Sequence, residues 1–159
     1  MKKLAMTAAA LLFAAPAMAQ QEKRTEVGVL DCVVEGGAGF VIGSQKDLSC
    51  TFTAAETARP KEVYTGKVSK FGLDVGITGV TLMQWLVLAP TTDPFGPGAL
   101  DGNYVGASAE ITAAIGGGAN ILIGGSNQTI VLQPVSVQAQ TGLNLAIGVS
   151  EFTLNAAVD

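Results

Sequence analysis

The sequence predicts an all-β protein, built as a single antiparallel barrel or sandwich of about 8–10 strands. Two observations predict this fold. Apolar residues alternate with small or polar ones at a period of two, and Gly, Pro, Asn, Asp or Ser separates most of the alternating runs. Alternation of this kind is typical of strands with one buried face, and the separating residues are typical of strand boundaries. We find no helical spacing after the N-terminal 19 residues.

Those first 19 residues resemble a secretory signal peptide. A basic start at Lys2 and Lys3 is followed by an apolar stretch at 4–15 and by an A-x-A sequence that ends at Ala19. The apolar stretch is shorter than the roughly 20 residues that a spanning helix needs. We therefore expect cleavage between Ala19 and Gln20, a periplasmic location, and a single β domain formed by residues 20–159.

Within this domain, the run at 82–88 is apolar on both faces except at Gln84, which indicates a strand covered on both sides or facing a cavity. The alternation changes phase at Gln133-Pro134 and again near Ser150-Glu151. Proline donates no ladder hydrogen bond, so Pro134 is expected at an edge or a bulge. We expect strands at 26–34, 39–43, 47–53, 62–69, 72–77, 80–88, 103–115, 119–124, 129–138 and 142–154.

A repeated order of short motifs indicates two related halves, although Gly-rich β sequences can also match by chance. Val27-Gly28 and the Gly-rich segment 36–44 are echoed by Val105-Gly106 and by segment 116–126. The Pro/Gly-rich segment 89–102 would join the halves. It is longer than most connections in compact domains, whose median is about 4–6 residues. It is either a rigid linker or a lid that presents Phe95.

Two cysteines remain after the predicted export, Cys32 and Cys50, and each lies on the apolar face of its strand. An even number of inward-facing cysteines in an exported chain indicates a structural disulfide. A redox pair would more often be a C-x-x-C near a helix start, and the sequence contains no such motif.

The composition excludes several classes of function. The chain has no His, which removes Ser-His and Cys-His nucleophile pairs and His metal ligands. Removal of Lys2 and Lys3 leaves seven Lys and Arg residues against 13 Asp and Glu, too acidic a balance for nucleic acid. No calcium-loop or phosphate-loop motif is present. We expect no metal, no cofactor and no enzymatic activity.

The remaining functions are binding or structural ones. We expect a cell-envelope protein that binds an apolar ligand, such as a lipid, or a protein partner, with Trp85 and Phe95 as candidate ligand contacts. Trp85 could equally be an ordinary core residue. The alternative is a small outer-membrane β-barrel, since run 103–115 has the length of a spanning strand. Against it, the mature chain has few aromatics for two interfacial girdles, and its last strand has no terminal aromatic.

Several segments of the chain are similar to one family, at residues 39–44, 48–50, 64–76, 104–110, 124–134 and 140–145. Together they resemble an uncharacterised family of small exported alphaproteobacterial proteins, the domain of unknown function numbered nine-nine-two. The resemblance covers nearly all of the mature chain. It implies export and a single domain, and it brings no activity, ligand or catalytic residue.

Overall fold

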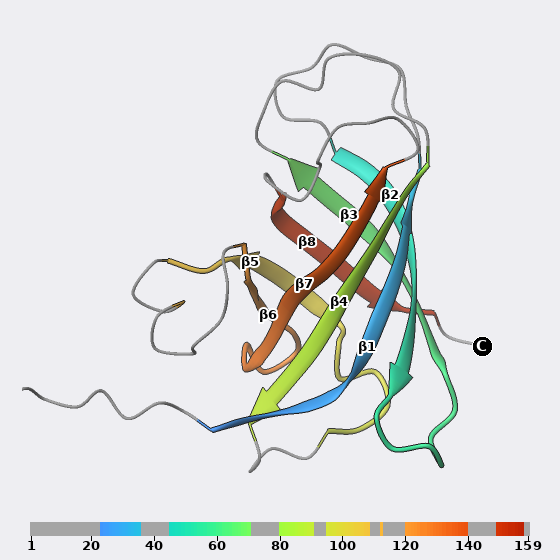
Figure 1. Cartoon of the computed structure of the whole chain (residues 1–159), viewed down its shortest axis with the longest axis vertical. Coiled ribbons are helices and arrows are strands. Elements are labelled where there is room, and N and C mark those ends of the chain that lie inside the picture. The colour runs from blue at the N-terminus through green and yellow to red at the C-terminus, as the bar shows by residue number, and fades with distance from the viewer. Residues whose placement is uncertain are drawn as a thin grey trace, which may run out of the picture.

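The computed structural model describes residues 23–35, 45–70, 80–90, 95–108, 112, 120–139 and 149–157. The described residues form eight strands (Figure 1). The strands are β1 (Arg24–Val34), β2 (Gln45–Ala54), β3 (Glu62–Lys70), β4 (Thr81–Pro90), β5 (Gly102–Gly106), β6 (Leu122–Gly124), β7 (Ile130–Ala139) and β8 (Val149–Ala156).

The eight strands close into a barrel, and every neighbouring pair is antiparallel. The order around the barrel is β1-β2-β3-β8-β5-β6-β7-β4, with β4 returning to β1. The predicted all-β antiparallel fold is confirmed, and of the two predicted architectures the barrel is the correct one. Closure removes the exposed strand edges that an open sheet would present.

The strand order has an internal symmetry. If β1 to β4 are exchanged with β5 to β8, in the same sequence, the order of strands around the barrel is unchanged. In each half the first three strands are consecutive neighbours, and the fourth strand crosses to the other half, so that β4 pairs with β7 and β8 pairs with β3. Of the motif echo, Val27-Gly28 lies on β1 and Val105-Gly106 lies on the corresponding strand β5, whereas segment 36–44 lies outside the described residues.

The barrel interior is apolar. Alternate residues of each long strand point inward, and the turn residue Leu100 joins them. An eight-stranded barrel has an interior just wide enough for side chains to fill. Strand β4 contributes its inward residues to this core, but Leu82 on its outer face is 44% exposed, so the predicted cover on both sides is absent at that position. The largest buried side chains are Trp85, Tyr64, Tyr104, Phe52 and Phe152.

Cys32 and Cys50 lie directly opposite each other on β1 and β2 and form a disulfide, as predicted. Their Cα atoms are 4.0 Å apart. This distance is close to the Cα spacing of a non-hydrogen-bonded residue pair in an antiparallel ladder. Both residues are at most 2% exposed. The disulfide therefore crosslinks β1 and β2 on the inner face of the barrel.

Both predicted phase slips are bulges. On β7 the register against β4 shifts so that Val135 is the extra residue beside Pro134. On β8 the register against β3 shifts at Ser150. A third shift, which the sequence analysis missed, lies at Val27 on β1. On β8, Val149 and Phe152 lie on either side of the bulge and are both buried, which accounts for the change of phase there.

The predicted strand 103–115 is wrong at Ala107, Ser108 and Thr112, and its residues 109–111 and 113–115 lie outside the described residues. Ala107 and Ser108 belong to no strand, and the Thr112 N–H bonds the Ser108 carbonyl, four residues back, as in a helical turn. Alternating Ala, Gly and Ser gives a period of two without bulky side chains to bury, so the pattern misleads here. The predicted strands 39–43 and 72–77, and residues 142–148 of the last one, lie outside the described residues.

Two inward-facing glycines let neighbouring strands approach closely. A Cβ atom on Gly66 would lie 1.7 Å from the Thr153 carbonyl oxygen, and one on Gly124 would lie 1.9 Å from the Asn103 oxygen. At both positions a side chain would therefore clash with the backbone of the neighbouring strand. Among the described residues, no helix is long and apolar enough to cross a membrane.

Candidate functional site

Trp85 lies in the middle of the barrel interior. It is on β4, paired in register with Leu30 of β1 and Pro134 of β7, and it is 2% exposed. Its ring meets Phe152 edge to face, with centroids 5.6 Å apart. The structure thus places this predicted ligand contact among core side chains.

The Trp85 indole has one polar atom, and that atom is unpaired. Nε1 is buried and has no hydrogen-bond acceptor in the described part of the chain. A buried donor without an acceptor costs about 1–3 kcal/mol, and buried indole N–H groups usually find a partner. An acceptor supplied by a bound molecule would remove this cost.

Phe95, the second predicted ligand contact, lies at one end of the barrel and not beside Trp85. Its ring packs on Phe52 with centroids 5.6 Å apart, and the Arg59 guanidinium lies 5.4 Å from the centre of its ring. The Phe95 carbonyl accepts a hydrogen bond from Arg59 Nη1. Phe95 is therefore part of the structure that closes this end of the barrel.

Glu62 is the centre of the polar contacts at the same end. Its Oε1 pairs with Arg59 Nη2 at 3.0 Å, and its Oε2 accepts from the Tyr64 hydroxyl at 2.5 Å and from the Gly98 N–H at 2.9 Å. The Arg59 and Glu62 side chains are 19% and 16% exposed. One carboxylate thereby joins the turn after β2, strand β3 and the segment before β5.

Two buried tyrosines lie under this cluster. The Tyr104 hydroxyl donates to the Leu100 carbonyl at 2.8 Å. Burial raises the pKa of both phenols above the ordinary value, and the hydrogen bond and charge of Glu62 raise the pKa of Tyr64 further. Both phenols therefore remain protonated hydrogen-bond donors at neutral pH.

Sequence reasoning missed this cluster. One signal was available, because Glu62 falls on the same alternating face as Tyr64 and Val68 and so points inward at the start of β3. An inward carboxylate needs partners. Its partners Arg59 and Gly98 carry no motif that would reveal the contact.

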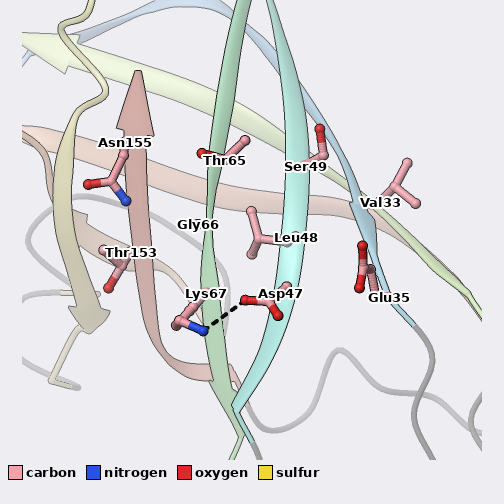
Figure 2. A pocket seen from close by; sticks show the side chains of 10 residues that line it. All are labelled: Val33, Glu35, Asp47, Leu48, Ser49, Thr65, Gly66, Lys67, Thr153 and Asn155. Atoms are coloured by element: carbon pink, nitrogen blue, oxygen red, sulfur yellow. Dashed lines mark hydrogen bonds and ion pairs between the residues drawn. The ribbon is translucent and has the colours of Figure 1, made fainter. Parts of the chain in front are cut away.

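A groove of about 650 Å³ lies on the outer wall of the barrel (Figure 2). Lys67 Nζ and Asp47 Oδ1 form an exposed ion pair in it, 2.8 Å apart. The groove extends from β8 on one side across β3 and β2 to β1 on the other. It is lined by Val33, Glu35, Asp47, Leu48, Ser49, Thr65, Gly66, Lys67, Thr153 and Asn155.

This groove contains the hydroxyl groups of Ser49, Thr65 and Thr153. Its hydroxyl groups have no His anywhere in the chain to activate them, and its Lys is already paired with Asp47. A smaller groove of about 360 Å³ over β4, β1 and β2 contains the Gln84–Asp31 hydrogen bond. Among the described residues no three His, Cys, Asp or Glu side chains are grouped to hold a metal ion.

Comparison with known proteins places the chain in a family. A family model described as Protein of unknown function (DUF992) matches residues 10–155. The chain belongs to this family. The match to DUF992 covers the barrel from β1 to Asn155 of β8, and it confirms the family membership that the sequence resemblance indicated. No curated protein and no solved structure matches the chain.

Proposed function

We propose that this member of DUF992 is an exported, non-catalytic protein of the periplasm that binds an apolar ligand inside its barrel. The single observation that carries the proposal is the unpaired Trp85 Nε1–H in an apolar interior. The ligand is expected to have an apolar body and at least one hydrogen-bond acceptor, such as an ester or ketone oxygen. That acceptor would satisfy the indole donor.

The orientation of the side chains supports this function over a small outer-membrane barrel. Outer-membrane barrels turn apolar side chains toward lipid and keep a polar interior. In the described strands the interior is apolar, and the outer wall carries the Lys67–Asp47 ion pair and the Thr153–Asn103 hydrogen bond. Carbonate extraction of membranes separates the two functions, because a membrane barrel would remain in the pellet.

Two matched probes test the proposal. 2-Nonanone carries a ketone oxygen, whereas 2-methyl-1-nonene has a methylene group in its place and accepts no hydrogen bond. Calorimetric titration of both probes into wild type and Trp85→Phe gives a ratio of affinities for each protein. We expect the ketone-to-alkene ratio to fall about tenfold or more in Trp85→Phe, as the loss of a buried hydrogen bond requires.

An equal ratio in the two proteins would contradict a role for the indole donor. Failure of wild type to bind either probe would contradict the proposed function. Amino-terminal sequencing and fractionation of the expressed full chain test the export step. A periplasmic protein that begins at Gln20 would support it, and an uncleaved cytoplasmic chain would contradict it.

A protein partner is the second candidate, favoured by apolar side chains on the outer wall. Val33 and Leu82 are paired in register on β1 and β4 and are 43% and 44% exposed. Val135, at the β7 bulge, is 58% exposed. The double substitution Val33→Lys, Leu82→Lys would abolish the binding of such a partner and leave probe binding inside the barrel unchanged.

A further inference from the structure

Residues 95–101, called the plug below, close one end of the barrel. They lie between β4 and β5, at the end where β2 turns into β3 (Figure 1). Leu100 is fully buried in the core cluster, and Phe95 packs against that cluster from the rim. Removal of the plug would therefore uncover the inward rings of Phe52 and Tyr64.

The plug has its own internal structure. The Ala99 N–H bonds the Gly96 carbonyl, and the Asp101 N–H bonds the Gly98 carbonyl, so two overlapping turns define its shape. A segment that carries its own turns can move as a unit without each residue losing its conformation.

Side chains attach the plug to the barrel. In the described part of the chain, Arg59 donates to the Phe95 carbonyl, Glu62 accepts from the Gly98 N–H, and Tyr104 donates to the Leu100 carbonyl. A longer bond of 3.3 Å joins the Ser126 hydroxyl to the Ala99 carbonyl. The strands, in contrast, are joined by continuous backbone ladders, such as the seven-residue register of β1 with β2. Segments held by few contacts open at lower free energy than strands in ladders.

Glu62 is shared between the barrel and the plug. Its carboxylate fixes the Arg59 guanidinium, which holds Phe95, and it also binds the Gly98 N–H directly. Loss of this one carboxylate would therefore weaken two of the attachments together.

A line of contacts leads from the plug to the proposed ligand donor. Leu100 is bonded to Tyr104, the Tyr104 ring meets Phe152 edge to face at 6.4 Å, and Phe152 meets Trp85 at 5.6 Å. The departure of Leu100 would leave space beside Tyr104, and the Tyr104 and Phe152 rings lie between that space and Trp85. The hydroxyl of Tyr104 would lose its acceptor at the same time and become available to a ligand.

We propose that the plug is a gate that Glu62 holds closed, and that its opening admits the apolar ligand to the barrel interior. The opening is a property of the protein alone, whereas the role as a ligand entrance rests on the proposed function. A ligand carbonyl would replace the Leu100 carbonyl as the acceptor for Tyr104. The closed structure therefore holds its own segment in the place of the ligand.

Hydrogen exchange of wild type tests the opening without any substitution. The Gly98 amide, whose acceptor Glu62 belongs to the barrel, is expected to exchange at least about a hundredfold faster than the amides of β1 and β2, because the plug opens while the barrel stays folded. Exchange of the plug amides at the rate of the barrel strands would overturn the gate, since the plug would then open only in global unfolding.

Acrylamide quenching of the fluorescence of Trp85, the one tryptophan of the sequence, tests whether Glu62 holds the plug closed. We expect Glu62→Gln to increase the quenching constant several-fold with an unchanged circular dichroism spectrum. Asp47→Asn is the matched control, because it removes a carboxylate from an exposed ion pair on the outer wall. Equal quenching in wild type, Glu62→Gln and Asp47→Asn would overturn the role of Glu62. If Glu62→Gln fails to fold, the exchange experiment on wild type still decides whether the gate exists.

Stopped-flow association of 2-nonanone separates the two proposals. Faster association with Glu62→Gln than with Asp47→Asn supports the plug as the entrance. Fast hydrogen exchange in the plug, together with no binding of 2-nonanone to any variant, would overturn the proposed function and support the gate. Binding of 2-nonanone, together with hydrogen exchange of the plug amides only through global unfolding, would overturn the gate and support the proposed function.

Discussion

Trp85 and Phe152 lie on corresponding strands of the two halves of the barrel, β4 and β8, and their rings meet edge to face with centroids 5.6 Å apart. Trp85 pairs with Leu30 on β1, and Phe152 pairs with Tyr104 on β5, the corresponding strand of the second half. The fourth strand of each half is the one that crosses over. The two crossing strands therefore meet through these aromatic rings at the centre of the core.

Replacement of Trp85 by Phe is expected to change stability by less than about 1 kcal/mol. The smaller ring loses packing contacts, but the substitution also removes a buried donor whose unpaired state costs about 1–3 kcal/mol. Urea unfolding measures the difference. Trp85→Ala is the control for packing and should cost about 3–5 kcal/mol. A loss of 3 kcal/mol or more, on the order expected for Ala, in Trp85→Phe would show that the N–H is satisfied.

Removal of the disulfide is expected to destabilise the barrel by about 2–5 kcal/mol. The bond joins two strands whose cysteines are 18 residues apart, so it restricts the unfolded chain. Urea unfolding of Cys32→Ser, Cys50→Ser against wild type measures the effect. Because both cysteines are at most 2% exposed, reduction of wild type should proceed at the rate of unfolding. Rapid reduction of the folded protein would contradict this burial.

Gly66→Ala is expected to destabilise the protein by more than about 3 kcal/mol or to prevent folding. The new Cβ atom would lie 1.7 Å from the backbone oxygen of Thr153, and β8 would have to move away from β3. Gly96→Ala is the control, since a Cβ atom there meets nothing within 4 Å. Its stability should lie within about 0.5 kcal/mol of wild type. Similar stability of the two variants would contradict the close approach of β3 and β8.

High pH is expected to unfold the protein through its two tyrosines. The pKa values of Tyr64 and Tyr104 are raised in the folded state above the ordinary 10.0, mainly by burial. Above about pH 10 the unfolded state releases phenolic protons that the folded state keeps, so stability falls as the pH rises. Phenolate absorbance should therefore rise together with loss of the β-sheet circular dichroism signal.

A matched variant tests the assignment of this pH dependence. Tyr64→Phe removes one of the two phenols, and the fall in stability above about pH 10 should become shallower. Ionisation of both tyrosines while the barrel remains folded would contradict their burial.

The sequence predicted the features that depend on local pattern. Alternation located β1 and β4 within a few residues, and the proline at 134 located a bulge because it cannot donate to the ladder. The inward phase of Cys32 and Cys50 predicted the disulfide. Each of these features depends on residues that are adjacent in the chain or on one face of one strand.

The rest depends on pairing between distant strands. Closure into a barrel requires β4 to pair with both β1 and β7, and no local pattern specifies these partners. The contact between Glu62 and Gly98 likewise joins residues 36 apart, through a backbone N–H that any residue type except proline would supply. Pattern also failed where small residues alternate, after Gly106, because alternation without bulk does not require a sheet.

The central claim is that the barrel interior supplies one unsatisfied donor to an apolar ligand. The chain has one tryptophan, so the nitrogen-15 spectrum of the labelled protein contains one indole N–H signal. Titration with 2-nonanone should shift this signal in the direction of a stronger hydrogen bond, whereas 2-methyl-1-nonene should not. An indole signal that stays in place while the ketone binds would contradict the claim.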